Sequence, residues 1–183
     1  MKHGFTLLEL LIVIGILAIL AAVVTVVLNP AELLKQARDS QRVSDLASLN
    51  SALGMYMADV ASPSLGVSTN CYVNSSAATT NCSGRHSGAL TYIASRAVDS
   101  NGWIPVNFTA ISSGSHLPIL PTDPTNNATY FYSYVPSIVA SSTYEIDAAF
   151  ESKKYTIDLD LDGKDGGNAT STYEVGTQPA LNF

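Results

Sequence analysis

The segment GFTLLELLIVIGILAILAAVVTVVL, residues 4–28, decides the fold of this chain because it can form one long apolar helix. Residues 5–28 would extend about 36 Å as an α-helix, which exceeds the roughly 30 Å hydrocarbon core of a bilayer. Glu9 is the one charged residue in this segment. A carboxylate buried in lipid costs at least about 2.5 kcal/mol, so Glu9 indicates a function beyond simple anchoring.

The charge that precedes this segment predicts its orientation in the membrane. Lys2 lies before the apolar run, so the positive-inside rule places the N-terminus in the cytoplasm and everything after Leu28 outside it. A secretory signal peptide would have a shorter apolar core followed by an A-x-A cleavage site, and no such tripeptide follows here. We therefore expect a bitopic membrane protein with an extracytoplasmic head. A simple signal anchor is the alternative, but it does not explain Glu9.

The residues around Glu9 carry a family resemblance. The run from Gly4 to Ile14, GFTLLELLIVI, resembles the class III signal of type IV pilins and of type II secretion pseudopilins. The resemblance implies cleavage by a prepilin peptidase after Gly4, methylation of the new amino terminus at Phe5, and assembly into a helical filament in the cell envelope or outside the cell. It also implies related pilins and an inner-membrane assembly platform as partners.

Glu9 fits this resemblance on physical grounds. Cleavage after Gly4 would create a charged α-amino group at Phe5. In a filament, Glu9 of the next subunit could neutralise that group inside a core of low dielectric constant, where each charge alone would be costly. We therefore expect Gly4 and Phe5 to serve processing and Glu9 to serve assembly.

The residues after the apolar segment predict a second, amphipathic helix. Asn29-Pro30 should interrupt the helix, because proline lacks an N–H donor and disfavours α conformation in the preceding residue. The charges that follow, including the i,i+3 pair Asp39 and Arg42, indicate a helix that is solvated or, alternatively, packed among neighbours. An apolar stripe should cover a sheet, and the helix should end near Asp59. The stripe consists of Leu46, Leu49, Leu53, Tyr56 and Val60.

The C-terminal half predicts a small antiparallel sheet. Residues 130–135, 143–150 and 155–159 are rich in aromatic and β-branched residues, and residues 151–154 could close a hairpin between the last two. Residues 61–129 indicate a long loop with short strands or a helical turn, in which the extended segments 103–106 and 117–121 pack on the core. The predicted class is α+β: a long N-terminal helix on an antiparallel sheet of three or four strands.

These elements divide the chain into four parts. Residues 1–4 are the expected leader peptide, residues 5–28 the transmembrane and filament-core helix, residues 29–60 the amphipathic helix, and residues 61–183 the β-rich head. Cys71 and Cys82 lie in a polar stretch of this head, where a disulfide is expected outside the cytosol and two free thiols are the alternative.

One run of residues in the head has the composition of a calcium loop. Asp158, Asp160 and Asp162 alternate before a glycine, and Asp165 follows, so hard oxygen ligands could converge on one ion. The twelfth position is Ala169 and not glutamate, which excludes an intact EF-hand and leaves Asp165, Glu174 or backbone carbonyls to complete the shell. Major pseudopilins, which this chain resembles, carry calcium in this region. The alternative is an edge strand with its carboxylates in water.

The composition contains little that indicates catalysis. Nucleophile-elbow, metalloprotease, Walker and dinucleotide-binding motifs do not occur, and His86 and His116 lie in polar loops where lone surface histidines are expected. A formal charge of −6 argues against a nucleic-acid partner. We therefore expect a structural subunit of a secretion pseudopilus or type IV pilus, not an enzyme. The alternative is an extracytoplasmic enzyme or binding domain on a simple anchor.

Overall fold

The computed structural model describes residues 4–86, 88–137 and 143–178. The chain forms two compact units, residues 1–35 and residues 36–183, which are described separately. The first unit contains α1, Leu7–Leu28, and the start of α2, Pro30–Asp59. Residues 7–25 form a helix that is long and apolar enough to cross a membrane.

A change of backbone conformation at Asn29 separates the two helices. Asn29 has φ 38° and ψ 74°, in the left-handed region, and α2 begins at the next residue, Pro30. The carbonyl oxygen of Asn29 accepts a hydrogen bond from the backbone N–H of Glu32 at 2.9 Å, so Asn29 also starts the second helix. The predicted interruption is therefore confirmed. Its physical reason is that Pro30 has no N–H with which to continue the hydrogen bonding of α1.

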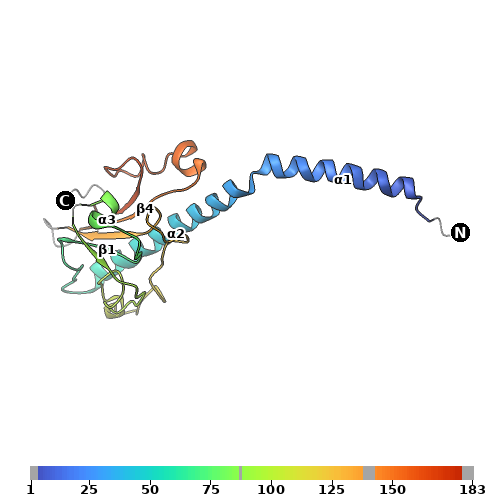
Figure 1. Cartoon of the computed structure of the whole chain (residues 1–183). Helices are drawn as coiled ribbons and strands as arrows, with labels where there is room; N and C mark the ends of the chain where they lie inside the picture. Colours follow the sequence, from blue (N-terminus) through green and yellow to red (C-terminus); the bar gives the residue numbers. More distant parts are fainter. Residues whose placement is uncertain (1–3, 87, 138–142, 179–183) are drawn as a thin grey trace. The chain divides into compact units, whose positions relative to one another are not determined.

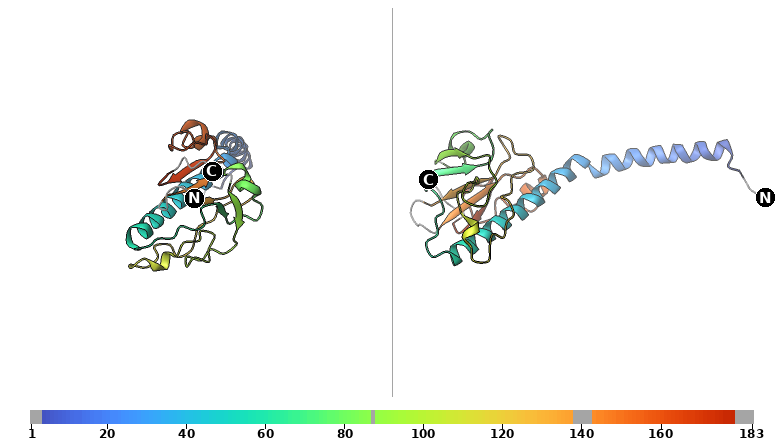
Figure 2. Two further views of the ribbon diagram at one scale, coloured as in Figure 1. Left: turned by 90° about the vertical axis from the view of Figure 1, so that its left-hand side faces the viewer. Right: turned by 90° about the horizontal axis from the view of Figure 1, so that it is seen from below.

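The second unit contains a five-stranded sheet in the order β2-β1-β3-β4-β5. The β1–β2 pair is parallel, and the other three pairs are antiparallel. Short helical segments α3 and η1 lie between the strands, and Figures 1 and 2 show the strands alongside α2. The elements are β1, Asn70–Val73; α3, Thr80–Gly84; β2, Ala89–Tyr92; η1, Phe108–Ala110; β3, Ser133–Pro136; β4, Tyr144–Ala148; η2, Lys154–Asp158; and β5, Tyr173–Gly176.

Two of the three predicted strands are confirmed with shorter bounds, as β3 and β4. The third prediction is wrong, because Lys154–Asp158 forms a short π-helix, η2. The predicted hairpin is therefore wrong as well. The partner of β4 is β5, with Ile146 opposite Val175, so the edge that residues 155–159 would have used is occupied. Ile157 is 67% exposed, so the β-branched residues of this segment do not form a buried face.

The apolar stripe of α2 covers one face of this sheet, as predicted. Leu46, Leu49, Leu53 and Tyr56 are buried, and Val60 is half-buried against them. The phenol of Tyr144 on β4 donates to the backbone oxygen of Asn50 on α2 at 3.2 Å. The α+β class with a long N-terminal helix on a mostly antiparallel sheet is confirmed. Residues of the sheet that pack in this core include Tyr72, Tyr134, Tyr144, Ile146 and Ala148.

The extended segments before β3 complete this core. Trp103, Ile104 and Leu120 are fully buried, which confirms that residues 103–106 and 117–121 pack on the core. The Trp103 indole donates to the carbonyl oxygen of Pro121 at 3.0 Å, so its polar atom is satisfied. The backbone at Gly102 packs closely against the backbone at Ala97. A Cβ at position 102 would overlap the Ala97 carbonyl oxygen, so only glycine fits there without a shift.

Candidate processing and assembly site

The expected cleavage bond lies in non-helical, exposed backbone. Gly4 and Phe5 precede α1 without helical structure, and Phe5 is exposed. A Cβ at Gly4 would meet no atom within 4 Å, so the fold of this chain does not itself require glycine there. Any requirement for glycine at this position would come from the peptidase that is expected to cleave after it.

Glu9 is positioned by a capping box at the start of α1. Its carboxylate accepts hydrogen bonds from the backbone N–H and the hydroxyl of Thr6, both at 2.8 Å. The Thr6 hydroxyl in turn accepts the backbone N–H of Glu9 at 3.2 Å. This reciprocal arrangement satisfies two of the unpaired donors at a helix start. Thr6 was not predicted as a site residue, although the T-x-x-E spacing before an apolar run is a sequence signal for a capping box.

The comparison with protein families identifies this segment. Residues 1–25 match the family model of the prokaryotic N-terminal methylation motif. The chain carries a prepilin-type signature. This motif is typical of type IV pilin-like and pseudopilin substrates of prepilin peptidase, and it implies pilus-type assembly. Searches of curated proteins and of solved structures gave no match.

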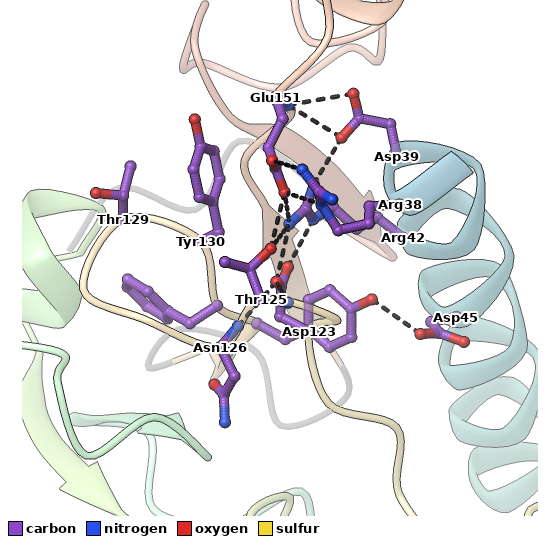
Figure 3. A network of polar contacts seen from close by, with 12 residues as sticks. Arg38, Asp39, Arg42, Asp45, Asp123, Thr125, Asn126, Thr129, Tyr130 and Glu151 are labelled. Carbon is purple, nitrogen blue, oxygen red and sulfur yellow. Dashed lines mark hydrogen bonds and ion pairs between the residues drawn. The ribbon is translucent and has the colours of Figure 1, made fainter. Parts of the chain in front are cut away.

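The head of this chain is joined to α2 by a buried ionic cluster, shown in Figure 3. The fully buried Arg42 guanidinium donates to Asp39 at 2.7 Å, to Asp123 at 2.6 Å and to Glu151 at 2.6 Å. Arg38 donates two further bonds to Glu151, at 2.8 and 2.5 Å. The predicted Asp39–Arg42 pair therefore exists, but the solvated alternative is wrong at these two positions, because loops of the head cover them.

The charges in this cluster favour one another. Burial disfavours the charge of Arg42, but its hydrogen bonds with Asp123, Glu151 and Asp39 outweigh burial and hold its pKa above the usual range. The hydrogen bond from Arg38 lowers the pKa of Glu151 to about 2, with further contributions from Arg42. Arg42 and Glu151 are thus charged at neutral pH, and the cluster holds α2 against the segments around residues 123 and 151.

The two cysteines lie on the face of the sheet away from α2. A disulfide joins Cys71 on β1 to Cys82 on α3, with their Cα atoms 6.2 Å apart. Both residues are buried and pack with Val73, Phe131 and Val135 in a second apolar cluster. The bond holds α3 onto the sheet.

The four carboxylates of the expected calcium loop occupy different environments. Asp158 is exposed at the end of η2, and Asp160 pairs with Lys164 at 3.4 Å. Asp162 is buried, which raises its pKa. Asp165 accepts the backbone N–H of Glu174 at 2.6 Å and lies beside it in an open hollow of about 360 Å³.

Among the residues that the structure describes, these four aspartates do not form a group of three whose ligand atoms lie within 4.8 Å of one another. The edge-strand alternative is wrong, because residues 154–158 are π-helical. Asp165 and Glu174 are the two suggested ligands that the fold brings together.

His86 is not the surface histidine that was expected. Its imidazole is 5% exposed, and its Nε2 lies 2.5 Å from Asp147 on β4. The sequence contains no local signal for this contact, because 61 positions separate the two residues. His116 is exposed, as expected.

Proposed function

We propose that this chain is a structural subunit of a type II secretion pseudopilus or a type IV pilus-like filament, cleaved after Gly4 and assembled through α1. The supporting observation is the prepilin-type signature on a helix that is long and apolar enough to cross a membrane. Every described side chain of α1 is exposed, including large apolar ones such as Ile16 and Leu17. Such a surface requires lipid before assembly and neighbouring helices after it.

The place of Glu9 supports the pairing proposed for assembly. Its carboxylate lies one helical turn from Phe5 and is bound only by Thr6 among the contacts described for it. The amine released at Phe5 by cleavage would supply the positive charge that this carboxylate lacks. In a filament core the pair would offset the cost of burying each charge.

The proposal also includes orientation, partners and an ion. The head would lie outside the cytoplasm, and an inner-membrane assembly platform would extract the processed subunit.

Calcium would bind near Asp165 and Glu174, with Asp158, Asp160 and Asp162 as further candidate ligands. Melting of the full chain during a calcium titration tests the ion, because a ligand that binds only the folded state raises the melting temperature. A flat response would remove calcium from the proposal.

Mass spectrometry of the chain isolated from its native cells tests the processing step. The expected N-terminus is N-methylated Phe5. An intact Met1 would contradict the proposal and favour a simple signal anchor carrying an enzyme or binding domain.

Glu9→Gln tests assembly separately. This variant keeps the shape of the side chain, and we expect cleavage to continue while sheared filaments disappear. Glu32→Gln in the first turn of α2 is the matched control and should assemble normally. Normal filaments from Glu9→Gln would refute the charge pairing but leave the processing step intact.

A further inference from the structure

The sheet face away from α2 buries ionisable side chains that the proposed filament function does not use. Along β4, Tyr144, Ile146 and Ala148 point into the apolar core under α2, so Glu145 and Asp147 point to the opposite face. Both carboxylates are only 1% exposed. Carboxylates are rarely buried this deeply unless they are paired or coordinate a metal.

His86 completes a compact group with these two carboxylates. Its Nε2 lies 2.5 Å from Asp147 Oδ2 and 3.9 Å from Glu145 Oε1, and the ligand atoms of all three residues lie within 4.8 Å of one another. The Ser133 hydroxyl on β3 donates to the same Asp147 oxygen at 2.9 Å and orients it. The other Asp147 oxygen, Oδ1, is buried and accepts no hydrogen bond from any residue that the structure describes. An unsatisfied buried carboxylate oxygen within a group of potential ligands has the coordination capacity that a cation would use.

The formal charges around this group also favour a cation. Glu174 on β5 is opposite Asp147 in the sheet register and is itself buried. Arg85 donates to the Ser133 hydroxyl at 3.2 Å and supplies one positive charge. With a neutral imidazole, the three carboxylates and this guanidinium leave a formal charge of −2. A divalent cation would balance it.

We propose that His86, Glu145 and Asp147 bind a divalent transition-metal ion, with Zn²⁺ as the best match. One imidazole nitrogen and two carboxylate oxygens suit Zn²⁺ or its neighbours, whereas Ca²⁺ prefers six to eight oxygen ligands. A water molecule would complete four-coordination. The site is separate from the calcium loop and does not depend on filament assembly.

The geometry requires only a small adjustment on binding. Ligands about 2.0–2.1 Å from a tetrahedral ion lie roughly 3.3 Å apart, so His86 and Asp147 would separate by under about 1 Å. Asp147 could also turn its unpartnered Oδ1 toward the ion. Bound metal would join the segment after the disulfide-linked α3 to the middle of the sheet, and so would stabilise the head.

Co²⁺ binding to the full chain in detergent tests this site, since Co²⁺ commonly reports zinc geometry through visible d–d absorption. After treatment with a chelator, we expect one Co²⁺ per chain, displacement by Zn²⁺, and no displacement by a 100-fold excess of Ca²⁺. His86→Ala should weaken binding by at least about 100-fold, because one of three ligands is lost. His116→Ala, the exposed matched control, should bind normally. Absence of the absorption bands in the unaltered chain, or equal binding by His86→Ala, would overturn the proposal.

A second measurement leaves the buried group unaltered, in case His86→Ala does not fold. The chain has three histidines, so the double substitution His3→Ala and His116→Ala leaves His86 as the last one. X-ray absorption of this variant loaded with Zn²⁺ should show scattering from one imidazole among oxygen ligands. A spectrum without imidazole would place the ion elsewhere and refute the site.

Discussion

Replacing Arg42 by methionine should destabilise the head more than any other single change of a charge in α2. Methionine keeps the volume and the apolar stem but removes a fully buried guanidinium that binds Asp39, Asp123 and Glu151. Removing one partner of a buried ion pair typically costs about 3–5 kcal/mol, because the remaining charge stays buried. The position of this cluster between α2 and two distant segments makes the whole head sensitive to the change.

The contacts that each carboxylate keeps after Arg42→Met determine how much stability is lost. Asp39 keeps two backbone donors, from Glu151 at 3.0 Å and from Ser152 at 2.8 Å. Glu151 keeps Arg38, whereas the donors that remain to Asp123 within the described part of the chain are neutral backbone N–H groups, such as that of Thr125 at 2.8 Å. Asp123 therefore loses the most. We expect a cost of about 4 kcal/mol, in the middle of the range for a broken buried pair.

Tryptophan fluorescence reports this loss directly, because Trp103 is the single tryptophan of the chain and is buried in the head. Urea unfolding of the full chain in detergent should show the loss of about 4 kcal/mol, and melting should fall by roughly 12 °C. Arg38→Met is the matched control. The Arg38 side chain is 34% exposed and Glu151 keeps Arg42 in this variant, so the loss of Arg38 should cost clearly less than the loss of Arg42.

A second substitution separates the buried charge from lost packing. Adding Asp123→Asn to Arg42→Met removes the carboxylate that the first change leaves uncompensated. The double variant should recover about half of the lost stability. If Arg42→Met costs no more than Arg38→Met, or if Asp123→Asn adds a further loss, the reasoning about the buried cluster is wrong.

Three further predictions concern other parts of the head. The pKa of Glu151 is about 2 against the usual 4.5, so its contribution is present above pH 4.5 and is lost as the pH falls toward 2. This contribution to the free energy of unfolding is about 3 kcal/mol. Glu151→Gln should therefore reduce the dependence of the melting temperature on pH between pH 4.5 and pH 2. Replacing Cys71 and Cys82 by serine should cost about 3 kcal/mol in urea unfolding, as expected for so short a loop. Gly102→Ala should cost about 2 kcal/mol because its Cβ would overlap backbone, whereas Gly54→Ala in α2 should not destabilise.

Each of these predictions has a result that would contradict it. If the melting temperature of Glu151→Gln falls as steeply with decreasing pH as that of the unaltered chain, the pH dependence comes from other carboxylates. Unchanged urea midpoints after the double serine substitution would show that the bond does not constrain the unfolded chain. Equal melting temperatures for Gly102→Ala and Gly54→Ala would mean that the backbone near residue 102 moves aside without cost.

Local patterns predicted the helices well. The interruption at Pro30, the end of α2 at Asp59 and the buried stripe beginning at Leu46 each follow from residues that are adjacent or one turn apart. The prediction for residues 155–159 was wrong because a high content of aromatic and β-branched residues over five positions does not show whether a partner strand is available. In this fold, β5 occupies that edge of the sheet.

The candidate sites also differ in whether their residues are close together or far apart in the sequence. Gly4, Phe5 and Glu9 lie in one short motif, so its resemblance to the prepilin-type signal was enough to predict processing and assembly roles for them. The buried group of His86, Glu145 and Asp147 combines a loop residue with a strand about 60 positions later, and no local pattern joins them. The sequence left open whether Arg42 is solvated or packed for a similar reason, since the covering segments are 81 and 109 positions away.

The sequence by itself determined the apolar helix, its charged position at Glu9 and the prepilin-type signature, because these depend on neighbours along the chain. The tertiary structure alone decided which charges are buried, which strand completes the sheet and which histidine meets two carboxylates. Those outcomes require segments far apart in the chain to come together, and their energies depend on burial, which a linear pattern does not specify. Glu9 therefore stays readable from the motif, whereas the ionic cluster at Arg42 and the proposed metal site became visible only in the folded head.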